Sequence, residues 1–185
     1  MPFFLQRASH WLALVAGVIA GVALVALLGV TIADVATRYL SRVTGGAIAL
    51  SVSGSVELVS YLMLMSLLAA MAANVEKSQV VVEAFTHGLS PAVKTRVHGV
   101  YLLGFAVLGW VLFSGLLDSA SAATRHGEVT QDLRLPMGPI FAFAAGLSLL
   151  LGVRALIHAL LGALFGVEAG DAEEKSIKSE AHHGK

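Results

Sequence analysis

Four long apolar stretches, separated by short polar segments, dominate the chain. Asp, Glu, Lys, Arg and His are absent from residues 11–33, 58–75, 99–117 and 135–153. A helix of about 20 residues, rising roughly 1.5 Å per residue, crosses the hydrocarbon core of a bilayer, so each stretch can supply a transmembrane helix. The pattern predicts an all-α integral membrane protein. Its four helices are expected at about 11–40, 55–75, 92–120 and 137–165.

The polar segments predict one domain and a tail. They are too short to form a second, water-facing core, so residues 1–167 are expected to be a single transmembrane domain. Val82, Phe85 and Leu89 have helical spacing beside polar residues, which indicates a short interfacial helix. Residues 168–185 are rich in charge and poor in large apolar side chains, which predicts a disordered tail.

Composition excludes several classes of function. The formal net charge is zero, which argues against nucleic acid as a partner, and the absence of Cys rules out disulfides, zinc–thiolate sites and thiol catalysis. Phosphate-binding loops, zinc-protease helices and nucleophile elbows are not found, so no enzyme, cofactor or metal is expected. The chain also lacks the paired midplane carboxylates and inverted repeat of a self-sufficient transporter.

The distribution of Lys and Arg predicts the orientation in the membrane. Because four helices place both termini on one side, Lys and Arg can be compared between the two sides. One side carries Arg7, Lys77, Lys94, Arg96, Arg154 and the tail lysines, and the other carries Arg38, Arg42, Arg125 and Arg134. Positive residues are retained in the cytoplasm, so both termini are expected there.

Charged residues near the helix ends are candidates for a polar site. Asp34 and Arg38 lie four residues apart, and Glu57 opens the second helix on the same side, so Arg38 could bridge the two carboxylates. An ion or substrate site would normally lie nearer the midplane, on a broken helix. A charge cluster that fixes helix register is therefore favoured over a transport site.

Histidine and small residues give two further expectations. His10, His98 and His158 lie towards the cytoplasmic ends of their helices, where two facing imidazoles could hold a b-type haem, and Arg154 and His158 form a polar i, i+4 pair. Interfacial or hydrogen-bonded histidines are favoured over haem ligands. Small residues four apart predict close helix packing. These pairs are Gly17 and Gly21, Ala69 and Ala73, and Gly162 and Gly166.

Four short motifs, in order between the helices, resemble those of one known family. The first helix closes with Arg38-Tyr39, and the second opens with Glu57-Leu58-x-x-Tyr61. Residues 77–83 follow the second helix, and Thr130-x-x-Leu133-x-x-Pro136 precedes the fourth. The chain is identified by these motifs as a member of the DctQ-like family, the small membrane subunits of tripartite ATP-independent periplasmic (TRAP) transporters.

The resemblance implies a function and partners. It implies a non-catalytic small permease subunit in the bacterial inner membrane that scaffolds a large, many-helix permease. The complex would take up a small solute, expected to be an organic acid, driven by sodium and delivered by a periplasmic binding protein. A four-helix cytochrome b-like haem protein, or another small membrane scaffold, is the alternative.

The resemblance also nominates residues. The helix-pair or large-subunit interface would use Asp34, Arg38, Tyr39, Glu57 and Tyr61. Lys77, Gln79 and Glu83 would lie in the cytoplasmic loop, where Gln79 and Glu83 replace the family's usual His and Asp. Thr130, Leu133 and Pro136 would form the periplasmic start of the last helix. The Trp that usually precedes the second-helix Glu of the family is not found near Glu57.

Overall fold

The computed structural model describes residues 2–45, 53–75 and 91–165 of the chain. This part of the chain forms four helices, each with a stretch long and apolar enough to cross a membrane, which confirms the predicted all-α membrane fold. The helices are α1 (Pro2–Val43), α2 (Ser55–Ala73), α4 (Pro91–His126) and α5 (Met137–Phe165). The expected interfacial helix and the tail lie outside the described residues.

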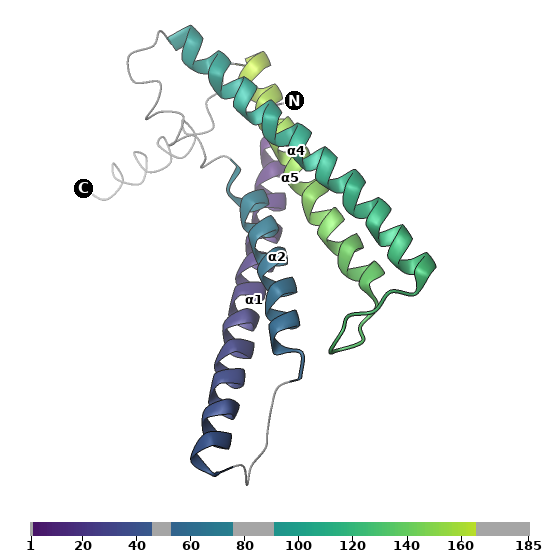
Figure 1. Cartoon of the computed structure of the whole chain (residues 1–185). Coiled ribbons are helices and arrows are strands. Elements are labelled where there is room, and N and C mark those ends of the chain that lie inside the picture. The colour runs from purple at the N-terminus through teal and green to yellow at the C-terminus, as the bar shows by residue number, and fades with distance from the viewer. Residues whose placement is uncertain (1, 46–52, 76–90, 166–185) are drawn as a thin grey trace, which may run out of the picture.

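The helices form two antiparallel hairpins, α1 with α2 and α4 with α5 (Figure 1). The two hairpins lie together where α1 begins and α2 ends, and they diverge towards the other end of the molecule (Figure 1). Contacts between the hairpins are made mainly by α2 and α5. The α4–α5 connection reaches back towards the start of α2 and bridges the diverging ends.

Helix α4 extends beyond the expected end near residue 120 and stops at His126. Its end is a Schellman motif, in which Gly127 N–H donates to Thr124 O at 3.4 Å and Glu128 N–H donates to Ala123 O at 2.9 Å. Gly127 adopts a φ of 64°, a left-handed conformation that glycine reaches without steric cost. The extra helical turns carry Arg125 to the end of the span and set the start of the connection to α5.

The core is built mainly from small side chains. Ala16, Ala69, Ala72, Ala144 and Ala155 have no exposed surface. Lipid gives helices no hydrophobic reason to associate, so close backbone approach through small residues supplies the van der Waals contact. A few leucines are buried with these alanines, and most other large apolar side chains remain on the outside.

Glycines let α4 and α5 approach closely where Gly109 of α4 meets Gly152 of α5. A Cβ at Gly109 would lie 2.5 Å from Gly152 N and 2.9 Å from Ser148 O. Of the small-residue pairs expected from the sequence, a Cβ at Gly17 would lie 4.0 Å from Ala73 Cβ, whereas a Cβ at Gly21 would have no neighbour within 4 Å. Gly162 and Gly166 lie outside the described side chains. The close approach of α4 and α5 instead uses Ser148 and Gly152, another pair of small residues four apart.

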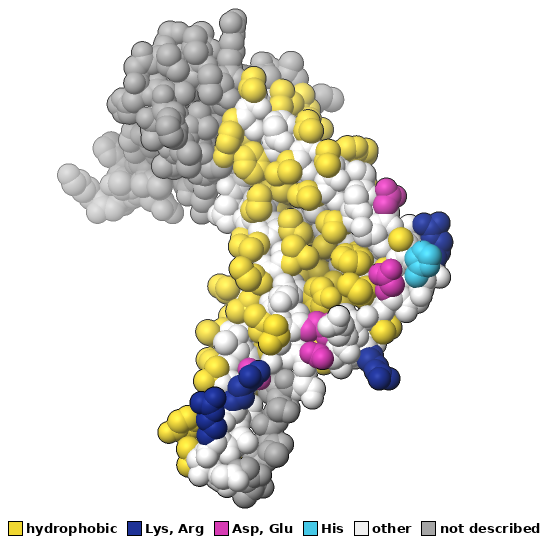
Figure 2. All heavy atoms as spheres, in the orientation of Figure 1, with side chains coloured by type: hydrophobic (Ala, Val, Ile, Leu, Met, Phe, Trp, Pro, Cys, Tyr) yellow, Lys and Arg dark blue, Asp and Glu magenta, His cyan; other side chains and the backbone are white. Residues whose placement is uncertain are grey.

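Large apolar side chains cover the outside of the helices. Trp11, Val25, Tyr39, Val100 and Trp110 are each at least 63% exposed, which only a lipid or protein environment would tolerate on this scale. Charged side chains gather towards one end of the visible face (Figure 2). Together with the four apolar spans, this surface identifies a multi-pass membrane protein.

Candidate functional site

Arg154 of α5 is the largest fully buried side chain in the described part of the chain. Its Nη1 donates to Ala73 O at 2.9 Å and to Ala72 O, and its Nε donates to Ser9 Oγ at 3.3 Å. Ala72 and Ala73 end α2, where carbonyls lack intrahelical partners and carry the negative end of the helix dipole. The guanidinium thus binds the C-terminus of α2 and joins it to α1 and α5.

Ser9 and His158 complete this group of residues, the Arg154 cluster (Ser9, Ala72, Ala73, Arg154 and His158). Ser9 Oγ lies 2.9 Å from His158 Nε2, and Ser9 is only 2% exposed. A hydroxyl group can accept from Arg154 and still bond the imidazole, since it has two lone pairs and one proton. The sequence indicated only an Arg–His pair at the membrane boundary, whereas the structure places the pair in a buried network of three helices.

The geometry of His158 does not favour haem ligation. The Nε2 atom of His158, which could coordinate an iron, is engaged by Ser9 instead. His10 is exposed, and the side chain of His98 lies outside the described residues. Within the part of the chain that the structure describes, no three His, Cys, Asp or Glu side chains gather as a metal site.

Glu57, in the first turn of α2, binds three successive backbone amides of the α4–α5 connection. Its Oε1 accepts from Gln131 N–H at 2.9 Å, and its Oε2 accepts from Asp132 N–H and Leu133 N–H, each at 3.2 Å. Hydrogen bonds to an ionised carboxylate are stronger than neutral ones. This Glu57 loop site (Glu57 with residues 130–135) joins the start of α2 to the α4–α5 hairpin.

The connection that Glu57 binds is itself ordered by hydrogen bonds. Thr130 N–H donates to Leu135 O at 2.9 Å, and Leu135 N–H donates to Thr130 Oγ1 at 3.0 Å. Val129 and Pro136 form an isolated antiparallel bridge, and Met137 N–H donates to Glu128 O at 3.0 Å. The predicted residues Thr130 and Pro136 therefore shape the loop rather than simply precede the helix.

Leu133 fastens the same loop to α2 by packing. A Cβ placed on Gly54, the residue that caps α2, would lie 2.5 Å from Leu133 Cγ. Gly54 also has a φ of 71°, so both its conformation and its contact with Leu133 require glycine. Arg134, next to Leu133, has a φ of 51°, which is uncommon for a residue with a side chain and marks the tip of the loop as strained.

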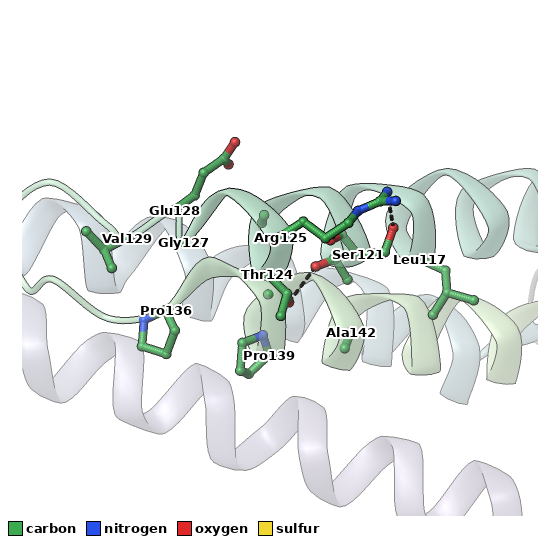
Figure 3. A pocket seen from close by; sticks show the side chains of 13 residues that line it. Leu117, Ser121, Thr124, Arg125, Gly127, Glu128, Val129, Pro136, Pro139 and Ala142 are labelled. Carbon is green, nitrogen blue, oxygen red and sulfur yellow. Dashed lines mark hydrogen bonds between the residues drawn. The ribbon is translucent and has the colours of Figure 1, made fainter.

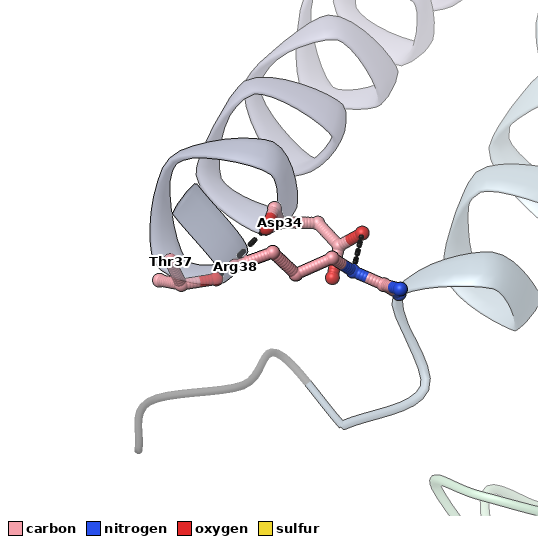
Figure 4. Close-up of polar contacts among 3 residues, drawn as sticks. All are labelled: Asp34, Thr37 and Arg38. Carbon is pink, nitrogen blue, oxygen red and sulfur yellow. Dashed lines mark hydrogen bonds and ion pairs between the residues drawn. The ribbon is translucent and has the colours of Figure 1, made fainter. Parts of the chain in front are cut away.

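Asp34 and Arg38 form an ion pair within α1 instead of a bridge to α2. Arg38 Nε donates to Asp34 Oδ2 at 2.9 Å, and Thr37 Oγ1 donates to Asp34 O at 2.9 Å (Figure 4). The proposed Arg38–Glu57 bridge is not among the ion pairs of the described residues. The hypothesis fails because the carboxylate of Glu57 binds the loop amides instead. Nothing in the sequence indicates that these amides lie beside Glu57.

The other nominated residues are not drawn into either site. Tyr39 is 70% exposed on the end of α1, and Tyr61 is half-buried on α2. Lys77, Gln79 and Glu83 lie outside the described residues. Ser9 is not among the residues expected from the sequence. Arg154 is expected only as half of a boundary pair, although an ionisable residue with apolar neighbours on both sides is itself a sign of a functional role in a membrane helix.

The sequence model of one protein family matches residues 27–165, and its description is "Tripartite ATP-independent periplasmic transporters, DctQ component". The match covers Glu57, the loop that it binds and Arg154, whereas Ser9 precedes it. Comparisons with curated proteins and with solved structures found no match.

Proposed function

The chain belongs to the DctQ family of TRAP transporter components, and on this premise we propose that it is a non-catalytic scaffold that braces the large permease subunit. A scaffold must hold its shape while its partner moves. Attachment of α2 at both ends to the α4–α5 hairpin is the observation that supports this role best.

The use of the polar groups supports a brace rather than a pump. In the described part of the chain, every buried side-chain nitrogen or oxygen has a hydrogen-bond partner. Arg154, the one fully buried cation there, binds helix-terminal carbonyls that a passing solute would have to displace. We therefore assign solute and sodium binding to the large subunit. The transported solute is proposed to be a small organic acid.

The orientation and the periplasmic partner are part of this proposal. The family implies the bacterial inner membrane, where the Lys and Arg distribution favours both termini in the cytoplasm and therefore the Glu57 loop site on the periplasmic side. The loop tip there carries Asp132, Arg134 and the 44%-exposed Leu135. A rigid, strained loop with mixed charge and apolar surface suits docking of the solute-binding protein.

The end of α1 is the proposed contact with the large subunit. Asp34, Arg38 and Tyr39 lie there, and the ion pair leaves Tyr39 projecting from the helix. Tyrosine is enriched in protein interfaces because a large ring carries a polar tip. Glu57 and Tyr61 would then act indirectly, by fixing α2 beside α1.

Co-purification tests the proposal. The tagged full-length chain should be extracted from its native membrane in mild detergent, and mass spectrometry should identify what elutes with it at fixed stoichiometry. We expect a large permease, with less of it recovered from Tyr39→Ala and unchanged recovery from Leu14→Ala, a control exposed elsewhere on α1. Sodium-driven uptake by the purified chain alone in liposomes would contradict the scaffold role.

A further inference from the structure

An open groove between α4 and α5 has no role in either site described above. Its volume is about 870 Å³, and it lies between the last turns of α4 and the first turns of α5 (Figure 3). Small-molecule sites occupy roughly 300–1,000 Å³, so the groove is large enough for a ligand. We propose that it holds one acyl chain of a zwitterionic phospholipid, whose phosphate binds Arg125.

The groove lies at the depth of lipid chains. Its lining includes Leu117, Ala120 and Ala142, which belong to the membrane spans Gly99–His126 and Met137–Leu160. From Leu117 to Arg125, α4 rises roughly 12 Å, which is most of the about 15 Å thickness of one leaflet. A chain lying along the groove would therefore run parallel to its neighbours in the bilayer.

The two hydroxyl groups in the lining are already satisfied within the protein. Thr124 Oγ1 donates to Ala120 O at 2.8 Å, and Ser121 Oγ donates to Asp118 O at 2.8 Å. Close packing of the helices shapes the floor, since a Cβ at Gly138 would lie 2.2 Å from Thr124 Oγ1. The lining is mainly apolar and offers water few partners, so a hydrocarbon chain suits the groove better.

The mouth of the groove carries charges of both signs. Arg125 ends the span of α4, and two of its five N–H donors go to Ser121, at 3.3 Å to the carbonyl oxygen and 3.2 Å to the hydroxyl. Arginine is well suited to binding phosphate through its remaining donors.

One carboxylate at the mouth decides the type of headgroup. Glu128 lines the mouth together with Arg125. Its carboxylate would repel a headgroup with net negative charge but would attract an ammonium group next to the phosphate. The pattern fits a headgroup of the ethanolamine type.

Lipid retention tests this inference directly. The full-length chain, with any membrane partner that co-purifies, would be exchanged into vesicles of equal phosphatidylethanolamine and phosphatidylglycerol, re-extracted and analysed by native mass spectrometry. We expect one retained phosphatidylethanolamine per chain. Arg125→Gln should retain about tenfold less, the effect of losing one hydrogen bond to a charged group. Arg42→Gln, an exposed arginine ending α1, should retain the wild-type amount.

A second pair of variants tests the groove independently of the charge of Arg125. Ala142→Phe would fill the groove and should abolish retention, whereas Ala33→Phe places the same side chain on exposed α1 and should not. A photo-crosslinker at residue 142 should label lipid. Equal retention in wild type, Arg125→Gln and Ala142→Phe, or crosslinking of residue 142 to a protein helix, would overturn the inference.

Discussion

The two ends of α2 are attached to the α4–α5 hairpin by opposite charges. At the C-terminal end, the Arg154 guanidinium is fully buried and donates to helix carbonyls. At the N-terminal end, the Glu57 carboxylate is half-buried and accepts from loop amides. Each charge matches the helix dipole at its end, positive at the C-terminus and negative at the N-terminus.

The difference lies in how far water can replace the lost contacts. Arg154 and Ala72 have no exposed surface and Ala73 is half-buried, so removal of the guanidinium leaves polar backbone groups poorly hydrated and without partners. Loop amides near Glu57 lie at the molecular surface, where water can bond to them. The Arg154 cluster is therefore expected to dominate stability, and the Glu57 loop site to dominate the local order of the loop.

Replacement of Arg154 should have the largest effect. Arg154→Met keeps most of the apolar stem but leaves the Ala72 and Ala73 carbonyls unsatisfied, which should cost about 2–4 kcal/mol. The midpoint of thermal unfolding in detergent should fall by on the order of 10 °C. Arg154→Lys should recover only part of the loss, since an ammonium group lacks the planar fork that reaches two helices.

Arg42→Met is the control for this substitution, because Arg42 is exposed at the end of α1. Its unfolding midpoint should match that of wild type. If Arg154→Met were as stable as Arg42→Met, the buried cluster would not join the hairpins, and the contrast between the ends of α2 would disappear.

Gly54→Ala tests the packing half of the Glu57 loop site. The new Cβ would lie 2.5 Å from Leu133 Cγ, and the alanine would have to keep a positive φ. Together these two effects should lower the free energy of unfolding by about 2 kcal/mol. Gly45→Ala is a matched control, because Gly45 has a φ of 58° and no neighbour within 4 Å, so it reports backbone strain alone. Calorimetric unfolding should show the larger loss in Gly54→Ala.

A smaller neighbour should relieve the clash at Gly54. The double variant Gly54→Ala with Leu133→Ala should be more stable than the sum of the two single losses predicts. Strict additivity of the two losses would mean that Leu133 does not contact Gly54, which would contradict the packing of the loop against α2.

Glu57→Gln should have a smaller effect on global stability and a strong local one. The amide keeps one oxygen acceptor but loses the charge that strengthens the three hydrogen bonds. Hydrogen exchange at Gln131, Asp132 and Leu133 should accelerate by about tenfold, with unchanged exchange in the middle of α5. Unchanged exchange at the loop amides would mean that the carboxylate does not order them.

The Asp34–Arg38 pair should contribute least. It joins neighbours on one exposed helix face, and such pairs are worth at most about 0.5 kcal/mol. Arg38→Gln should therefore unfold like wild type. Because Arg38 lies in the proposed contact with the large subunit, this variant should lose more of the co-purifying large subunit than of its stability. A large loss of stability in Arg38→Gln that is rescued by adding Glu57→Gln would instead support a direct ion pair between Arg38 and Glu57.

The sequence located the polar residues of the site better than it located their partners. Family motifs nominate Glu57, Thr130, Leu133 and Pro136. The first three belong to the Glu57 loop site, and Pro136 follows it directly. The partner assigned to Glu57 was wrong, because Arg38 offered an obvious opposite charge at the right end of the membrane. Ser9 carried no signal of its own, since a single serine near a helix start is common.

The amino-acid sequence by itself determined the four membrane spans and the family. Hydropathy is a property of short segments, and a helix in lipid must satisfy its backbone internally wherever it packs. Only the tertiary structure decided what Arg154 and Glu57 bind. Their partners are mainly backbone carbonyls and amides 74 to 82 residues away, and every residue offers similar groups. No sequence pattern distinguishes such groups until the crossing of the two hairpins brings particular ones together.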